Sequence, residues 1–173
     1  MTAISLAHAG KPDLRHPDRF FATTIRLRSE GTDHLLLRYG SLYGPGAIDD
    51  WVALLRKRQF PLVGRGTGYM SWVHLDDAAS ATVLAVEKHA KGVFDIADDE
   101  PAPAAEWLPY LAACAGAKRP MRIPAWLARL LAGELAVTIM TEGRGFSNAK
   151  ARRELGWEPR YPSWRQGFRE ELT

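Results

Sequence analysis

The sequence has very little cysteine and no long apolar run. Cys114 is the single cysteine among 173 residues, which excludes an intrachain disulfide and a cysteine-based zinc site. It lies in the apolar segment LPYLAACAG, so we interpret it as a packing residue. No stretch approaches the ~20 apolar residues that a membrane span needs. The first residues lack the basic start and apolar core of a signal peptide, so we expect a cytoplasmic protein with no membrane partner.

Strong net charge is also absent. The chain has 23 Lys and Arg against 20 Asp and Glu, and its formal net charge is +3. The short basic clusters at 56–58 and 152–153 belong to no recognisable nucleic-acid-binding motif, and solvated helix faces explain them better. The five histidines show no ligand spacing such as H-E-x-x-H. We therefore expect neither a nucleic-acid partner nor a metal site.

The pattern that is present favours an α/β fold. Two short apolar runs bounded by turn residues predict buried strands, at 34–39 and 93–97. Asp49 or Asp50, and Asp76 or Asp77, are candidate N-caps of two helices. Helices are predicted at the following residues: 18–29, 49–58, 77–90, 103–115, 124–133, 147–155 and 163–172. The alternation of strands and helices favours α/β over all-α architecture.

One glycine-rich segment, GRGTG at 64–68, lies between two short strand-like runs, 60–63 and 71–73. It does not open a helix, so its N–H groups would gain no helix-dipole support for phosphate binding. We interpret it as a hairpin or a mobile loop. Residues 1–16 show no hydrophobic periodicity, and we interpret them as a loosely ordered lead. A single domain is expected over residues 17–173.

Three segments together carry a family resemblance. They are LRYGSLYGPG at 37–46, WVHLDDAA at 72–79, and SNAKA with LGWEP within 147–159. In this order and spacing they resemble the LR-x-x-x-x-YGPG, FVHVDDVA and SKA…LGW-x-P segments of the epimerase/dehydratase group of extended short-chain dehydrogenases. The resemblance covers about residues 18–172. It implies the C-terminal half of such an enzyme: the last strands of a Rossmann-type sheet with a small helical substrate-binding lobe.

The family's cofactor and catalytic signatures do not occur in this sequence. There is no G-x-G-x-x-G and no Tyr-x-x-x-Lys, the pair whose phenolate moves a proton during hydride transfer. The closest spacing is Tyr161 with Arg165, and arginine stays protonated, so it cannot simply replace lysine. We therefore expect no catalytic residues and no turnover by this chain alone. NAD or NADP is implied by the resemblance only.

The resemblance also suggests binding residues. They are Tyr39 and Gly40 for the cofactor, and Ser41, Tyr43, Trp72 and His74 for substrate. The alternative is structural: Tyr39 ends a strand, Gly40 allows a tight backbone path, and His74 is a hydrogen-bonded core residue. Trp107, Trp126, Trp157 and Trp164 are expected to pack in the core or lobe. Asp76 and Asp77 are rejected as an acid–base pair, because adjacent residues at a helix start do not point to one atom.

One departure from the family bears on the substrate. In nucleotide-sugar members an arginine four residues before the histidine of the VHV segment holds the diphosphate, and here that position is Met70. A thioether cannot neutralise phosphate, which disfavours a nucleotide sugar. Arg65 or Arg144 is a candidate replacement, although a solvated arginine is the simpler interpretation.

Three functional hypotheses remain. The first is the substrate-binding half of an epimerase, dehydratase or reductase, catalytically incomplete alone, with a small polar ligand. The second is an interaction module that docks on a partner, such as a complementary Rossmann half, or on a second copy to complete its sheet. The physical reason for this hypothesis is that a buried strand without neighbouring strands leaves its backbone N–H and C=O groups unpaired. The third, an enzyme of another mechanism, lacks a visible nucleophile–base set.

Overall fold

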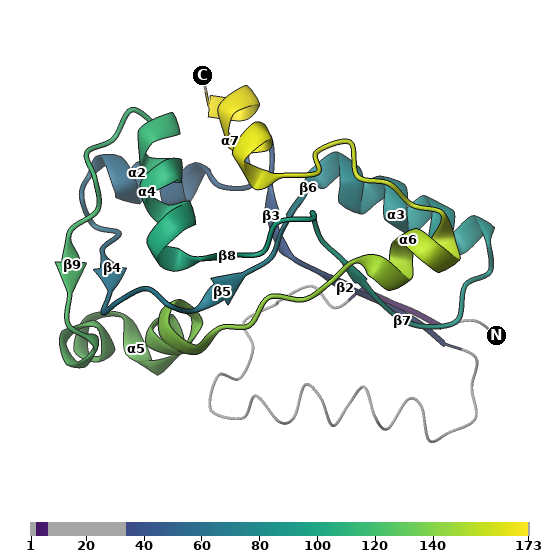
Figure 1. Ribbon diagram of the computed structural model, residues 1–173, viewed down its shortest axis with the longest axis horizontal. Helices are drawn as coiled ribbons and strands as arrows, with labels where there is room; N and C mark the ends of the chain where they lie inside the picture. The colour runs from purple at the N-terminus through teal and green to yellow at the C-terminus, as the bar shows by residue number, and fades with distance from the viewer. Residues whose placement is uncertain (1–2, 7–33, 173) are drawn as a thin grey trace.

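The computed structural model describes residues 3–6 and 34–172 (Figure 1). Within these residues the chain has a mixed α/β fold, as expected from the sequence. A small parallel sheet is covered by two helices, α3 and α6, and the chain then forms a lobe of helices and two-stranded ladders (Figure 1). The helix predicted at 18–29 lies outside the described residues. None of the helices that the structure describes is long and apolar enough to cross a membrane.

The parallel sheet has the order β1-β2-β7, from Ala3–Leu6, His34–Tyr39 and Gly92–Ile96. Both strands predicted from apolar runs are therefore present, and they are direct neighbours. β2 lies in the middle and is paired along both edges, so the open strand that motivated the docking hypothesis is not found. Within the segment expected to be a loose lead, Ala3–Leu6 pairs in parallel with β2 as a strand.

The glycine-rich segment does not form a hairpin. β4 (Leu62–Val63) pairs with β9 (Arg122–Ile123), and β5 (Tyr69–Met70) pairs with β8 (Ala102–Pro103). The loop between β4 and β5 is instead packed against the lobe. The carbonyl groups of Gly66 and Gly68 accept hydrogen bonds from the first N–H groups of helix α4. A Cβ at Gly68 would lie 2.2 Å from the Ile139 carbonyl oxygen, so only glycine allows this approach.

The ladder between the sheet and the lobe comprises β3 (Ser41–Tyr43) and β6 (Trp72–His74). These strands continue the chain from β2 and lead into α3, and therefore fix the lobe against the sheet. The helices are α2 (Asp49–Arg56), α3 (Leu75–Glu87), α4 (Ala104–Cys114), α5 (Ala125–Glu142), α6 (Ala149–Leu155) and α7 (Trp164–Leu172).

Three details of the predicted helices were wrong. α5 was expected to end near residue 133 but continues to Glu142, with a break at Gly133, whose φ is 82° and ψ is 171°. The N-cap of α2 is Ile48, with no side-chain cap. The N-cap of α3 is His74 rather than Asp76 or Asp77, since the His74 Nδ1 accepts the Asp76 N–H at 3.1 Å.

Two hydrophobic clusters stabilise the chain. One lies between the sheet, α3 and α6, and includes Phe94 and Trp157. The other fills the lobe and is rich in aromatic rings, with Trp72 and Trp107 5.1 Å apart at their centroids. Trp126 is an exception to the expected packing of tryptophans, because 66% of its surface is exposed.

Candidate functional site

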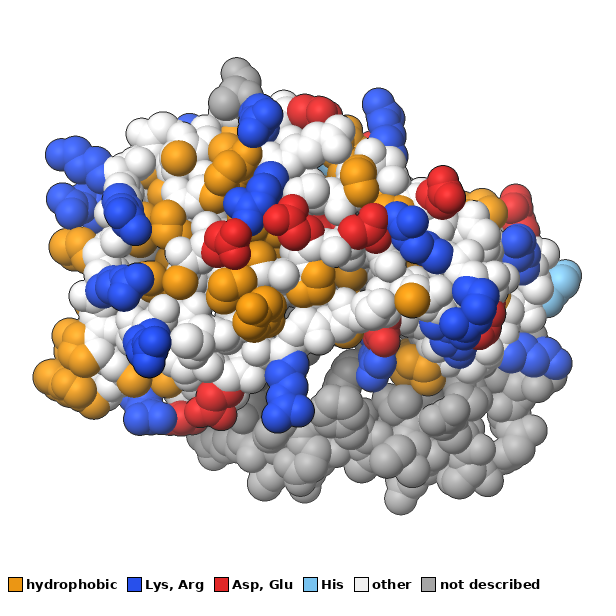
Figure 2. Space-filling view, viewed as in Figure 1, with side chains coloured by type: hydrophobic (Ala, Val, Ile, Leu, Met, Phe, Trp, Pro, Cys, Tyr) orange, Lys and Arg blue, Asp and Glu red, His pale blue; other side chains and the backbone are white. Residues whose placement is uncertain are grey.

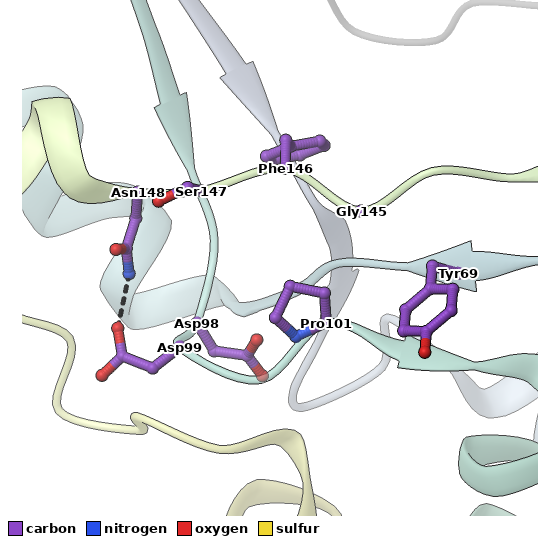
Figure 3. A pocket seen from close by; sticks show the side chains of 8 residues that line it. All are labelled: Tyr69, Asp98, Asp99, Pro101, Gly145, Phe146, Ser147 and Asn148. Carbon is purple, nitrogen blue, oxygen red and sulfur yellow. Dashed lines mark hydrogen bonds between the residues drawn. The ribbon is translucent and has the colours of Figure 1, made fainter.

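A pocket of about 360 Å³ opens beside the segment that follows β7 (Figure 3). Three segments that are distant in sequence meet there. The lining residues are Tyr69, Asp98, Asp99, Pro101, Gly145, Phe146, Ser147 and Asn148. In open α/β sheets, ligands bind beyond the carboxyl ends of the strands. This position makes the pocket the candidate site.

Asp98 is the buried acid of the pocket, with 2% of its surface exposed. Its Oδ2 accepts the Trp164 N–H at 2.7 Å, and its Oδ1 accepts the Glu100 N–H at 3.2 Å. Burial disfavours the charged carboxylate and raises the pKa of Asp98 to about 7, although these two hydrogen bonds act in the opposite direction. The group therefore changes its protonation state near neutral pH.

Asn148 fixes the opposite wall. Its Nδ2 donates to the Ala97 carbonyl oxygen at 2.8 Å and to Asp99 Oδ1 at 2.7 Å, the contact drawn in Figure 3. Asp99 Oδ2 in turn accepts from Arg152 at 2.6 Å. Both N–H donors of the Asn148 amide are thus occupied, so its carbonyl oxygen is the atom that remains for a ligand. The charge of Asp99 is partly balanced by Arg152.

The remaining wall is apolar. Tyr69, Pro101 and Phe146, drawn in Figure 3, contribute rings to the lining. Ser71 holds the Phe146 segment in place, because its Oγ accepts the Phe146 N–H at 3.0 Å. A Cβ at Gly145 would lie 2.5 Å from the Pro101 Cβ, so a larger residue there would shift this wall. The pocket therefore combines a flat apolar side with hydrogen-bonding groups at its base.

The predicted cofactor residues have structural contacts. The Tyr39 hydroxyl lies 2.6 Å from Thr82 Oγ1 on α3. A Cβ at Gly40 would lie 2.8 Å from the Ser71 carbonyl oxygen, and the Ser41 N–H donates to that same oxygen. Contact of Tyr39 and Gly40 with a cofactor stays a prediction. Ser41 is partly exposed beside them.

Tyr43, Trp72 and His74, predicted to face substrate, are each at most 1% exposed. His74 stacks on Tyr161 with ring centroids 4.0 Å apart, and its Nε2 lies 3.1 Å from Glu171 Oε1. The structure brings these three side chains together, but none of them lines the pocket. Their participation in ligand binding stays a prediction.

The glycine-rich loop at 64–68 does not fit a dinucleotide pyrophosphate. A phosphate cradle needs backbone N–H groups that point at the ligand from a helix N-terminus. The loop at 64–68 instead directs the Gly66 and Gly68 carbonyls at the N-terminus of α4. Within residues 3–6 and 34–172, no group of three His, Cys, Asp or Glu side chains is placed to hold a metal ion.

The pocket residues were not predicted from the sequence as a site. Asp98 and Asp99 gave a usable signal, because they directly follow a predicted buried strand. Nothing local connects them to Asn148, which is 50 residues further along the chain than Asp98, or to Tyr69. These contacts depend on the fold.

Known proteins resemble this chain in sequence. Residues 22–97 match the family model described as "NAD dependent epimerase/dehydratase family". The 3-diazoavenalumate denitrifying reductase of a Streptomyces species is 44% identical over 167 residues, which covers 90% of this chain and 55% of the relative.

Solved structures show the same fold. The human epimerase family protein SDR39U1, solved with NADPH, has a TM-score of 0.72 at 19% identity and covers 99% of this chain and 59% of its own. The UDP-glucose 4-epimerase from Thermotoga maritima, solved with UDP-glucose, has a TM-score of 0.62 at 23% identity. The match covers 88% of this chain and 50% of the epimerase chain. The chain thus spans somewhat more than half the length of the reductase it matches. Over residues 22–97 the chain matches the NAD dependent epimerase/dehydratase family model, and its fold is similar to part of the fold of the human epimerase family protein.

Proposed function

We propose that this chain is the substrate-binding part of an NAD(P)-dependent reductase of the epimerase/dehydratase family. The observation that carries the proposal is the pocket beyond β7, with buried Asp98 and Asn148 at its base. The type of reaction rests on the 44% identity to a reductase, against 23% for the UDP-glucose epimerase. Nucleotide-sugar members have a phosphate-binding arginine at the position of Met70, so this residue also disfavours a nucleotide-sugar substrate.

The pocket suits a small ligand with one flat face and one polar group. Tyr69, Pro101 and Phe146 offer ring surface, which favours stacking with a planar group. The Asn148 carbonyl and the Asp98 carboxyl offer hydrogen-bond acceptors to a donor on the ligand. The named substrate of the related reductase, 3-diazoavenalumate, is the first compound to test here.

We further propose that the chain is catalytically incomplete alone. Hydride transfer needs a bound nicotinamide and a group that moves a proton beside it. The sequence has neither Tyr-x-x-x-Lys nor a glycine fingerprint, and the described glycine loop does not fit pyrophosphate. The role of this chain would then be to hold and orient substrate for a cofactor bound elsewhere.

The substrate proposal is tested by NMR on the isotopically labelled chain. 3-Diazoavenalumate and, separately, UDP-glucose are titrated while the Asn148 side-chain amide and the Gly145 backbone amide are followed. We expect saturable shifts of both signals with the diazo compound and none with UDP-glucose. Phe146→Ala should weaken binding, whereas Val83→Ala, on exposed α3 surface, should not. Shifts that map away from the pocket, or stronger binding of UDP-glucose, would contradict the proposal.

A second candidate is a module that completes its sheet on a partner or on a second copy. Its support is that β1 and β7 each have one strand neighbour among the described residues. Outer strands present backbone groups that another strand can pair with. Analytical ultracentrifugation separates the candidates, since a stable monomer over a wide concentration range argues against self-association.

A further inference from the structure

The end of the lobe carries exposed apolar side chains at the start of α5. Trp126, Leu130 and Leu131 are 66%, 78% and 71% exposed, and Met121, just before β9, is 50% exposed. They lie within eleven residues of one continuous segment, 121–131. We call these four residues the apolar tip. Soluble surfaces expose single large apolar residues routinely, but a group of this kind marks an interaction site.

The tip protrudes from the molecule. Every residue from 129 to 135 is exposed, and α5 is broken within this stretch at Gly133. A Cβ at Gly133 would meet nothing within 4 Å, so the backbone itself stands clear of its surroundings. Exposed apolar side chains at the start of a helix can insert into the headgroup region of a bilayer.

The charges along the sequence of the tip are mostly basic. Between Glu106 and Glu134 the sequence has no Asp or Glu, and it has four basic residues, all exposed: Lys118, Arg119, Arg122 and Arg129. Figure 2 shows apolar side chains at the lower left end of the molecule and basic side chains along the same edge. Arg129 is paired with Glu134, but both side chains are at least half exposed, so this pair is weak and open to exchange.

We propose that the apolar tip and its four cations form a docking surface for an anionic lipid bilayer. Tryptophan and leucine insert at the headgroup boundary, while lysine and arginine attract anionic lipids from a few ångströms away. This goes beyond the proposed function and is independent of the pocket. It departs from our expectation of no membrane partner, which rested on the absence of a spanning segment. Peripheral docking needs no such segment.

The test is vesicle flotation of the full chain. One set of vesicles is pure phosphatidylcholine, and the other contains about 30% phosphatidylglycerol. We expect binding to the anionic vesicles to be at least about tenfold tighter, and to weaken when salt is raised to about 0.5 M. Equal binding to both sets, or no binding to either, overturns the proposal.

Variants then assign the binding to this surface. The triple variant Trp126→Ser, Leu130→Ser, Leu131→Ser and the double variant Arg119→Gln, Arg122→Gln should each lose most of the binding. Val83→Ser with Val86→Ser is the matched control, because these exposed apolar residues lie on α3, and it should bind as the parent does. Circular dichroism checks that each variant is folded. Unchanged binding by the triple variant contradicts the assignment. If the parent ignores vesicles but forms a dimer that the triple variant does not form, the tip is a protein interface and the lipid proposal fails.

Discussion

The side chain of Asp77 accepts the backbone N–H of Tyr161 at 2.9 Å and that of Arg160 at 2.7 Å. This one buried carboxylate ties the segment between α6 and α7 to the first turn of α3, 83 and 84 residues earlier. The Trp157 indole adds a third tie, because its Nε1 donates to the Asp77 carbonyl oxygen and to Ser80 Oγ. The C-terminal segment is thus held by an acid that sequence reasoning had assigned only to a helix cap.

Asp77→Ala should lower the free energy of unfolding by about 3 kcal/mol, because it leaves two inward-facing N–H groups without a charged acceptor. Urea denaturation followed by tryptophan fluorescence measures this. The control is Asp76→Ala, whose side chain is 68% exposed, and it should stay within about 0.5 kcal/mol of the parent. Equal effects of the two variants would show that the contacts to Arg160 and Tyr161 contribute little.

His74 caps α3 through its Nδ1, which identifies the Nε2–H tautomer that donates to Glu171. Truncation to Ser keeps an oxygen that can accept the Asp76 N–H, whereas truncation to Ala does not. His74→Ser should therefore be about 1 kcal/mol more stable than His74→Ala in urea denaturation. Identical stabilities would mean that the histidine acts only by packing against Tyr161.

Removal of the side-chain hydroxyl should affect stability differently at two tyrosines, Tyr43 and Tyr110. The Tyr43 hydroxyl finds no hydrogen-bond partner among the residues that the structure describes, so Tyr43→Phe should leave the thermal midpoint unchanged or raise it. The Tyr110 hydroxyl donates to the Arg165 carbonyl oxygen and accepts from Arg169, so Tyr110→Phe should cost about 1 kcal/mol. Calorimetry of both variants checks the pair, and a clear loss in Tyr43→Phe would reveal a partner for that hydroxyl.

Asp98 predicts a dependence of stability on pH. Its pKa is raised from 3.8 to about 7, chiefly by burial, so between these values the folded chain holds a proton that the unfolded chain has released. The contribution of Asp98 to stability is therefore largest below pH 4, falls as pH rises towards 7, and is constant above that.

The measurement is urea denaturation of the parent and of Asp98→Asn from acid to neutral pH. Because the asparagine cannot titrate, the parent should lose stability relative to the variant over this range. A constant difference between the two proteins would show that folding does not shift the pKa of Asp98.

Local sequence patterns located β2, β7 and most of the helices, because apolar runs and amphipathic periods are properties of neighbouring residues. Which strands pair with one another could not be predicted from such local patterns. The glycines at 64–68 resemble a hairpin turn, yet β4 pairs with β9, about 60 residues away, and the loop is shaped by contacts with α4 and α5. His74 was preferred to Asp76 as the cap because its ring is already fixed by Tyr161 and Glu171, and no spacing rule contains that information.

The candidate site, like the fold, could be predicted only in part from the sequence. Asp98 follows a strand that the sequence predicts, so its place beyond the sheet could be inferred. The meeting of Asp98 with Asn148 and Tyr69 depends on the path of the chain through α5, which continues beyond Gly133 against the local signal. The family resemblance directed attention to Tyr43, Trp72 and His74, which are buried in the aromatic core.

We proposed that this chain holds substrate and does not bind the cofactor by itself. Isothermal titration calorimetry of the chain with NADPH and with NADH tests it most directly. The account predicts no saturable binding of either nucleotide up to about 1 mM. Saturable binding of one nucleotide with a Kd near about 1 μM would contradict it.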